Sequence, residues 1–419
     1  MGPDSRCRKV PSVPTPASGR ASGLFAHRPF LLFFWGRGLS EFAYQIGAVA
    51  VGWQVYALTG SAFDLGMVGL VQFIPTAVLV FAAGHAADRY DRNRVVQVCQ
   101  IVEGLTAAFL ACGTLGGWLT VPEIFCAVAV FGTATAFESP AASALLPGVA
   151  ADGLLQTGTA LSTGMFQIAS ISGPALGGVA YAVSPALPYV AMAVCWVAGG
   201  LLSGAIRVAR PLAPREPASI ATLFAGFNFV RHSPAILGTI SLDLFAVLLG
   251  GATALLPIYA RDILHTGPWG LGVLRGAPAV GALLMTAVLA RHAITRRVGV
   301  RMFQAVIAFG AATVVFAASQ VIWLSLIALL VMGAADTVSV VIRLSLVQLG
   351  TPDEMRGRVG AVNYLFINAS NELGQFESGI TAAWLGAMPA AVLGGLGTII
   401  IALLWMKLFP ALRKVERLE

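Results

Sequence analysis

Apolar runs of about twenty residues recur from end to end of this 419-residue chain, and they constrain its fold more than any other feature. An α-helix of that length crosses a hydrocarbon core of about 30 Å. Hydrophobic residues make up 57% of the chain and charged residues 11%, against about 25% charged in a typical soluble domain. So few charges could not cover a water-soluble protein of this size. The sequence therefore predicts an all-α membrane protein.

The apolar runs fall into two groups of six, which predicts twelve transmembrane helices. The first six are expected at 30–58, 64–84, 94–117, 121–146, 153–181 and 185–206. The second six are expected at 236–261, 268–290, 300–318, 321–349, 356–383 and 387–409. The expected domains are a disordered cytoplasmic tail (1–28), an N-terminal six-helix bundle (29–206), a cytoplasmic linker (207–234), a C-terminal six-helix bundle (235–410) and a cytoplasmic tail (411–419).

The positive charges of the loops fall in alternate loops. Lys and Arg occur around 6–28, 89–94, 207–231, 291–301, 343–358 and 407–417. The intervening loops contain none, with the single exception of Arg261. By the positive-inside rule, both termini are expected in the cytoplasm. The net charge of +7 therefore reflects topology, and nucleic acid is excluded as a partner because the charges form no continuous patch.

The linker between the two halves has a pattern of its own. Three prolines open it, and its apolar residues then recur at helical spacing. The prolines are Pro211, Pro214 and Pro217, and the apolar residues are Ile220, Leu223, Phe224, Phe227 and Val230. This spacing predicts an amphipathic helix on the cytoplasmic surface of the membrane.

The two halves also share an internal repeat. At an offset of 203, Tyr56, Gly69, Gln72 and Pro75 correspond to Tyr259, Gly272, Arg275 and Pro278. At an offset of 201, Gly132, Asp152, Gly173 and Gly178 correspond to Gly333, Asp353, Gly374 and Gly379. Parallel repeats of this kind place a substrate site between the halves, near the middle of the bilayer. Chance matching of common glycines and prolines is the alternative.

The loop after the second span reads Gly84-His-Ala-Ala-Asp88-Arg89-Tyr-Asp91-Arg92-Asn-Arg94. It resembles the GxLaDRxGRR loop of the major facilitator superfamily, in the DRxDRxR variant of its drug-antiporter and macrolide- or enterobactin-exporter branch. The resemblance implies the major facilitator fold of two pseudo-symmetric six-helix bundles. It also implies a conformational latch between the halves, formed by Gly84, Asp88, Arg89, Arg92 and Arg94. A basic loop that only sets topology is the alternative.

The fifth span contains a second resemblance to the superfamily. Its antiporter motif ends in GPxxGG, and the matching residues are Gly164, Gly173, Pro174, Gly177 and Gly178. In the superfamily this motif accompanies exporters more than importers. Alanine stands at positions 160 and 169, where the full pattern has glycine. Ordinary small-residue packing between helices therefore remains the alternative.

The eleventh span carries the most specific string, Glu372-Leu-Gly-Gln-Phe-Glu377-Ser-Gly379. It resembles the enterobactin-exporter branch, whose members read close to ELGEFESG here. The span also has a polar stripe at helical spacing, formed by Tyr364, Asn368, Asn371, Glu372 and Gln375. A polar face in lipid is expensive, so we expect the stripe to face a water-filled cavity or another helix.

The first span has a similar polar face, and further charges lie within other spans. The face consists of Arg37, Ser40, Glu41, Tyr44 and Gln45, in which Arg37 and Glu41 are an i,i+4 pair of opposite charge. The other intramembrane charges are Glu138, Asp243, Asp336 and Arg343. Any of these acids is a candidate proton carrier, since a carboxylate with a movable Arg partner can be switched. A static buried ion pair is the alternative for each charge.

Enzymatic and metal chemistry are not indicated. The five cysteines are scattered without a CxxC pair, the five histidines do not cluster, and no GxxxxGK[ST] loop occurs. We therefore expect no enzyme activity, no metal and no cofactor, with the proton gradient as the energy source. The resemblance implies an exporter of a siderophore or hydrophobic drug in a bacterial inner membrane, functional as a monomer. An importer or facilitator of a small metabolite on the same fold is the alternative.

Overall fold

The computed structural model describes residues 24, 27–150, 154–207, 220–292, 294–352 and 354–417, and the elements in these residues are all helical. The first half contains α2 (Arg28–Thr59), α3 (Ala62–Arg89), α4 (Arg92–Gly116), α5 (Val121–Val149), α6 (Leu155–Val183) and α7 (Leu187–Gly204). The second half begins with α8 (Ile220–His232), α9 (Pro234–Leu249), η1 (Ala252–Leu255), α10 (Leu256–Ile258) and the π-helical turn η2 (Tyr259–Ile263). It continues with α11 (Gly267–Arg291), α12 (Val298–Ala318), α13 (Ile322–Leu349), α14 (Arg356–Leu385), α15 (Ala387–Leu408) and α16 (Pro410–Arg413).

The helices confirm the expected all-α membrane fold. Ten helical segments of the described chain are long and apolar enough to cross a membrane. The two remaining long helices are α2, with 32 residues, and α14, with 30. These two carry the polar stripes, which lower the apolar content of both helices. Both are packed among the other long helices.

The seventh span departs from the continuous helix expected at 236–261. Gly250 and Gly251 separate α9 from the short turns η1, α10 and η2. A Cβ on Gly251 would overlap the backbone carbonyl of Gly374 in α14, so this close crossing requires glycine. Pro257 then lies at the start of α10, where its missing N–H donor is tolerated. The span is therefore broken where it crosses α14.

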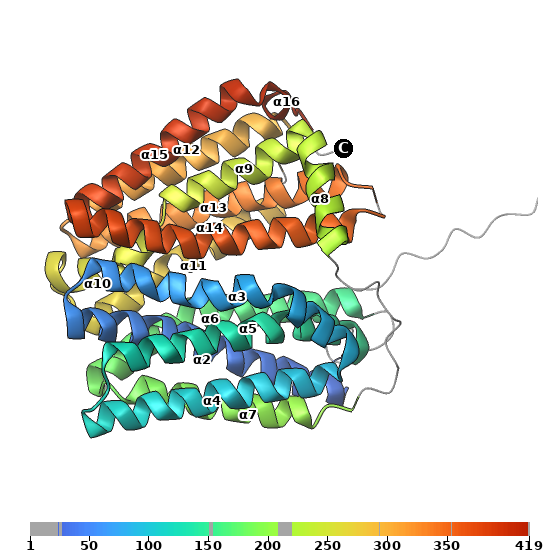
Figure 1. Cartoon of the computed structure of the whole chain (residues 1–419). Helices are drawn as coiled ribbons and strands as arrows, with labels where there is room; N and C mark the ends of the chain where they lie inside the picture. The colour runs from blue at the N-terminus through green and yellow to red at the C-terminus, as the bar shows by residue number, and fades with distance from the viewer. Residues whose placement is uncertain are drawn as a thin grey trace, which may run out of the picture.

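The long helices form two bundles that meet along a common interface (Figure 1). The first bundle consists of α2 to α7, and the second of α9 to α15. Across the interface α3 packs against α14, and α6 packs against α11. The repeat makes α3 equivalent to α11 and α6 equivalent to α14, so the two contacts are related by the pseudo-symmetry. In each contact, the helix equivalent to α3 in one half packs against the helix equivalent to α6 in the other half.

The same repeat is visible within each bundle. Gly132 of α5 packs so closely on α3 that a Cβ would overlap the carbonyl oxygen of Gln72. Its repeat partner, Gly333 of α13, packs in the same way on the carbonyl oxygen of Pro278 in α11. Because glycine has no side chain, the two helix backbones can approach this closely.

The linker contains the expected helix, α8, directly before α9. Val230 is buried against the second bundle, in a cluster with Ile236 and Val359. Phe224 and Phe227 are exposed, as a helix resting on a membrane surface requires. The three linker prolines and the side chains of the first two apolar positions lie outside the described residues, as do residues 1–23.

Candidate functional site

The two halves touch at the end of the molecule remote from the start of α2 and from α16 (Figure 1). There a Cβ on Gly66 of α3 would lie 2.9 Å from the Cα atom of Gly379 in α14. A Cβ on Gly178 of α6 would lie 2.5 Å from a backbone oxygen of α11. At the opposite ends of these helices, a Cβ on Gly164 of α6 or Gly360 of α14 would meet no described atom within 4 Å. The halves are therefore closely packed at one end of these helices, and the glycines at the opposite, open end have no such contact.

A polar clasp joins the halves at the packed end. The Tyr56 hydroxyl in α2 donates a hydrogen bond to the Asp262 carboxylate in η2. Arg261 donates from Nη1 to the Tyr56 carbonyl oxygen at 3.1 Å, and its guanidinium carbon lies 5.4 Å from the centre of the Tyr56 ring. Arg261 is the residue that departs from the alternating charge pattern of the loops. Its contacts in the clasp account for its position.

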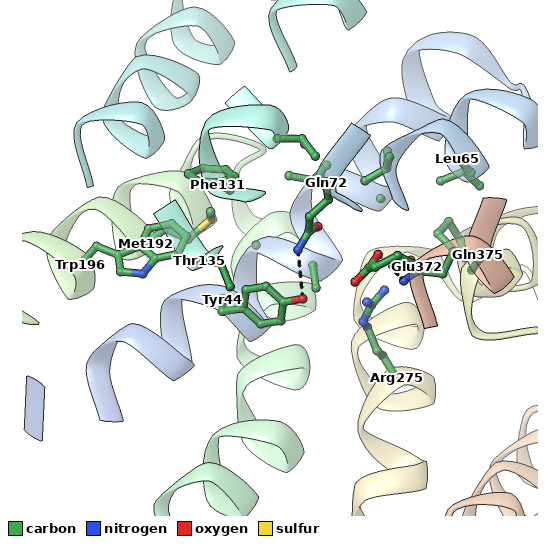
Figure 2. Close-up of a pocket in the computed structure, with 18 residues that line it drawn as sticks. Tyr44, Leu65, Gln72, Phe131, Thr135, Met192, Trp196, Arg275, Glu372 and Gln375 are labelled. Carbon is green, nitrogen blue, oxygen red and sulfur yellow. Dashed lines mark hydrogen bonds between the residues drawn. The ribbon is translucent and has the colours of Figure 1, made fainter. Parts of the chain in front are cut away.

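Both halves line a cavity of about 70 Å³, and Figure 2 shows its lining residues. Tyr44 of α2 and Gln72 of α3 come from the first half, and Gln72 Nε2 donates to Tyr44 Oη at 3.2 Å. Arg275 of α11 and two residues of α14, Glu372 and Gln375, come from the second half. Gln375 Nε2 donates to Glu372 Oε2 at 3.0 Å. Arg275 points toward Glu372, and their opposite charges interact electrostatically.

The wall opposite the charged pair is apolar. Phe131, Met192 and Trp196 line it, from α5 and α7. A site with one apolar wall and a few converging polar groups suits an amphipathic small molecule. Sites for drug-sized ligands usually enclose about 300–1,000 Å³, so this cavity must widen before it holds such a molecule. Movement of the two halves changes its size because both halves line it.

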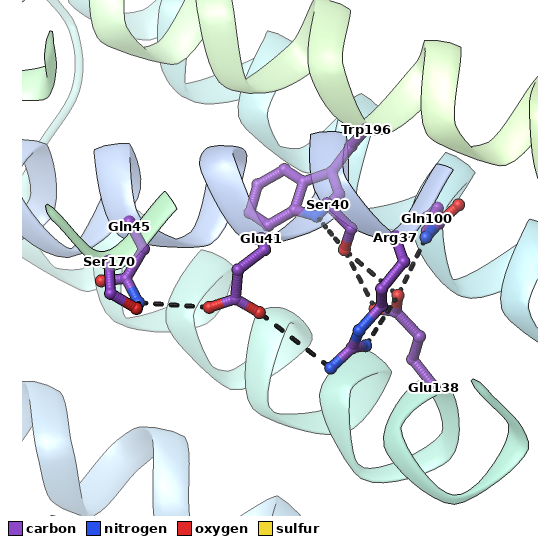
Figure 3. Close-up of polar contacts among 8 residues, drawn as sticks. All are labelled: Arg37, Ser40, Glu41, Gln45, Gln100, Glu138, Ser170 and Trp196. Atoms are coloured by element: carbon purple, nitrogen blue, oxygen red, sulfur yellow. Dashed lines mark hydrogen bonds and ion pairs between the residues drawn. The ribbon is translucent and has the colours of Figure 1, made fainter. Parts of the chain in front are cut away.

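A second polar group lies within the first bundle (Figure 3). The predicted pair of Arg37 and Glu41 is confirmed, with Nη2 4.0 Å from Oε2. Arg37 also reaches Glu138 of α5, with Nη1 3.6 Å from Oε1. Gln45 Nε2 donates to Glu41 Oε1 at 3.1 Å and to Ser170 Oγ of α6 at 3.3 Å. Arg37 and Glu41 also line a separate cavity of about 280 Å³ within this half.

Glu138 is the most heavily bonded acid of this network. Ser40 Oγ donates to Glu138 Oε1 at 3.1 Å, and Gln100 Nε2 of α4 donates to the same oxygen at 2.9 Å. Trp196 Nε1 of α7 donates to Ser40 Oγ at 3.2 Å. Ser203 Oγ donates to Gln100 Oε1 at 3.0 Å. The network therefore connects Glu138 to α7, whose Trp196 also lines the central cavity.

The charges of the second bundle form a different arrangement. Arg343 of α13 and Asp243 of α9 are both buried and form an ion pair with each other. Asp336 shares a helix face with Arg343 by spacing, but the guanidinium is paired with Asp243. Asp336 and Asp243 line the same small pocket. The arrangement resembles a static pair that fixes the register of α9 and α13.

The loop expected to form the latch contacts its own half in this structure. Arg94 pairs with Asp91, Nε to Oδ2, at 3.6 Å. Arg92 Nη1 donates to the Ala144 carbonyl oxygen of α5 at 3.4 Å. Gly84 and Arg89 lie in the last turns of α3, and the side chain of Asp88 lies outside the described residues. A latch across the interface stays a prediction.

The antiporter-like motif lies on α6 between two other helices. A Cβ on Gly173 would lie 2.6 Å from Gln45 Cβ, and one on Gly177 would lie 3.0 Å from the Ile46 carbonyl oxygen, both in α2. Gly178 faces α11 instead, and Pro174 is buried beside it. Four of the five motif residues thus mediate close packing, and Gly164 has open space.

The stripe on α14 meets the cavity through only part of its length. Glu372 and Gln375 line the cavity, whereas Asn371 is exposed and donates to the Ile367 carbonyl oxygen at 2.9 Å. Asn368 is half-buried. The side chain of Tyr364 lies outside the described residues.

Sequence reasoning overlooked Arg275 and Gln72 as site residues. Arg275 lies within the expected span 268–290 and entered only as the repeat partner of Gln72. A charge inside an apolar span is itself a functional signal, so Arg275 could have been found. Gln72 offers no such signal, because a neutral amide is common in helix packing.

Comparisons with known proteins cover most of the chain. Residues 23–419 match the family described as transmembrane secretion effector. The chain is similar to the enterobactin exporter EntS of Citrobacter koseri, with 26% identity over 412 residues that cover 94% of this chain and 95% of the relative. The enterobactin exporter EntS of Salmonella typhimurium is also 26% identical, over 413 residues and with the same coverage.

Two solved structures share the fold. One is a bacterial homologue of the human lysosomal transporter Spinster in an inward-facing and unoccupied conformation, with a TM-score of 0.70 at 11% identity, covering 95% of this chain and 97% of that chain. The other is the nucleoside transporter NupG, with a TM-score of 0.69 at 15% identity, covering 91% of this chain and 99% of that chain. At these identities the likeness concerns the fold alone.

Proposed function

The chain belongs to the transmembrane secretion effector family of the major facilitator superfamily, and we propose that it exports an amphipathic small molecule by proton-coupled alternating access. Its family and relatives are membrane transporters, so the chain is a secondary transporter and not an enzyme. We place the cargo among siderophores and hydrophobic drugs. The proton gradient supplies the energy, and no cofactor takes part.

The observation that carries this proposal is the placement of Arg275 and Glu372 against an apolar wall in a cavity lined by both halves. The charged groups suit the polar part of an amphipathic molecule, and Phe131 and Trp196 suit its apolar part. Because both halves line the cavity, relative movement of the halves changes access to it. One chain supplies the whole site, which favours a monomeric transporter.

The proposed alternating access is based on the packed and open ends of the interface between the two halves. With both chain termini in the cytoplasm of a bacterial inner membrane, the open end is the cytoplasmic one, and the structure faces inward. The outward-facing state then requires the halves to part at the clasp and to close at the ends near Gly164 and Gly360.

Weakening the clasp is expected to favour the outward-facing state. Asp262→Ala removes the carboxylate that accepts from the Tyr56 hydroxyl. A hydrogen bond to a charged group contributes about 1.5–3 kcal/mol, and the lower end suits this half-exposed carboxylate, so the ratio of the two states should shift by about tenfold. The measurement is maleimide labelling of Thr163→Cys, which lines the cavity of the first half, in a cysteine-free background. Labelling from the cytoplasmic side should slow in Asp262→Ala, by at most the factor by which that ratio shifts. Unchanged labelling would mean that the clasp does not hold the inward-facing state.

The direction and energy source of transport can be tested in membrane vesicles. Everted vesicles with an acidic interior are expected to accumulate enterobactin when they contain this transporter, and a protonophore should abolish the accumulation. Vesicles without the transporter are the control, and a panel of hydrophobic dyes tests the drug class in parallel. Accumulation in right-side-out vesicles instead would identify an importer. Accumulation that survives the protonophore would exclude proton coupling.

A further inference from the structure

Glu103 of α4 is a buried acid that none of the roles above uses. Glu103 is 2% exposed and Glu138 is 4% exposed. Gln100, one turn before Glu103 on α4, donates to Glu138 at 2.9 Å, and Glu103 interacts with the Glu138 carboxyl group and with the Thr135 hydroxyl. The Oε2 atom of Glu103 is buried without a hydrogen-bond partner in the described part of the chain. An ionised carboxylate in this position would be strongly destabilised.

The charges around the two acids favour a state in which the pair holds one proton. Two carboxylates in contact inside a bilayer cannot both stay ionised. Among the described residues, Arg37 is the cation that interacts with both acids, and it also pairs with Glu41. Two further titratable groups of the described residues face the pair, the Cys99 thiol and the Glu41 carboxyl group. Glu138 accepts bonds from two neutral donors in addition to Arg37, so Glu138 suits the ionised form and Glu103 the protonated form.

The acid pair lies directly behind the wall of the central cavity. Thr135 lines that cavity and also bonds to Glu103. Trp196 lines it too, and is linked to Glu138 through Ser40. On the other side, the Arg37 side chain is 38% exposed and lines the separate cavity of the first half. A change of contacts in either cavity can therefore alter the surroundings of the two acids through one or two intervening polar contacts.

We propose that Glu103 and Glu138 share one proton and form the proton-carrying site of the transport cycle. This inference rests on the proton-coupled export proposed above. Cargo that contacts Thr135 or Trp196 changes the hydrogen bonds to the pair. Movement of Arg37 from Glu138 toward Glu41 changes the charge beside it. Each change alters how firmly the pair holds its proton, which couples cargo to proton.

The test uses the full chain with Glu103→Gln as the main variant and Glu377→Gln as the matched control. Glutamine is neutral and similar in shape to protonated glutamate, so the main variant is expected to fold. Glu377 lies on α14 outside the cavity lining and accepts a bond from Thr381 Oγ1 at 2.8 Å. If Glu103→Gln does not fold, Glu103→Asp is used in its place. The infrared C=O band of the protonated carboxyl group should then shift in frequency and should not disappear.

The first measurement needs no cargo. Infrared spectra of the protein in lipid nanodiscs at neutral pH, compared in H₂O and D₂O, report the C=O band of buried protonated carboxyl groups. We expect one such band to disappear in Glu103→Gln and to persist in Glu377→Gln. An unchanged spectrum in Glu103→Gln would overturn the inference.

The second measurement is uptake of enterobactin into everted vesicles. Glu103→Gln should keep downhill exchange and lose gradient-driven accumulation by at least about tenfold, while Glu377→Gln behaves as wild type. If a protonophore does not reduce accumulation by the wild-type protein, the proposed proton-coupled function is wrong. If the protonophore does reduce it, and Glu103→Gln accumulates enterobactin as well as the wild type and is equally inhibited, only the proposed proton site is wrong.

Discussion

Arg275→Ala is expected to reduce enterobactin uptake into everted vesicles by about 30-fold or more. Arg275 is a cation that faces Glu372 in the central cavity, and its removal leaves that carboxylate without its nearby opposite charge. Truncating one member of a buried, hydrogen-bonded charge pair at a binding site costs about 2–5 kcal/mol, and each 1.4 kcal/mol corresponds to about tenfold. Arg275 and Glu372 interact electrostatically without a direct hydrogen bond, so the lower end of this range applies. The initial rate of uptake, normalised to transporter content, measures the effect.

The matched control for this variant is Arg291→Ala. Arg291 is an exposed arginine at the end of the same helix, α11, and lies outside the cavity. It should transport within about twofold of wild type, whereas Arg275→Lys should recover part of the rate because it keeps the charge but not the planar fork. Equal rates for Arg275→Ala and Arg291→Ala would show that the cavity charge does not bind cargo.

Gly333→Leu is expected to remove most of the folded transporter from the membrane. A Cβ alone at this position overlaps the carbonyl oxygen of Pro278, a backbone atom of α11 that cannot rotate away. Overpacking of this kind costs about 1–3 kcal/mol and occasionally more, and here α13 and α11 must separate along their contact. Gly132→Leu, at the equivalent contact of the first bundle, should behave in the same way. Size-exclusion profiles and thermal unfolding in detergent measure the loss.

Gly360→Leu in α14 serves as the control because open space surrounds its Cβ position. It should elute as wild type does and unfold at a similar temperature. A monodisperse Gly333→Leu protein of unchanged thermal stability would show that the two helices are not as closely packed as described.

Much of the fold could be predicted because the features that favour membrane insertion of a segment lie within that segment and its flanking loops. The apolar length of each span, the alternation of positive loops and the spacing in the linker all follow from neighbouring residues. The helices α2 to α7 and α11 to α15 accordingly coincide with expected spans, and α8 lies where the linker pattern placed it. The break of the seventh span was not predicted. It depends on α14 passing over Gly251, which is 123 residues away from its contact Gly374 (374 − 251).

The candidate site divides in the same way. The polar faces of α2 and α14 could be read from residue spacing, because a helix places every third and fourth side chain on one side. The partners of those side chains could not. By spacing, Arg343 and Asp336 share one face of α13, whereas packing pairs Arg343 with Asp243 of another helix. Packing likewise brought Glu103 against Glu138 and Arg275 toward Glu372.

By itself, the sequence determined that this chain crosses a membrane many times, in two related halves with polar faces turned inward. Only the tertiary structure decided which charges meet, where the cavity lies and at which end the halves are closed. The reason is physical. Solvation by lipid depends on the composition of each segment alone, whereas an ion pair or a shared proton depends on distances of a few ångströms between helices far apart in the sequence.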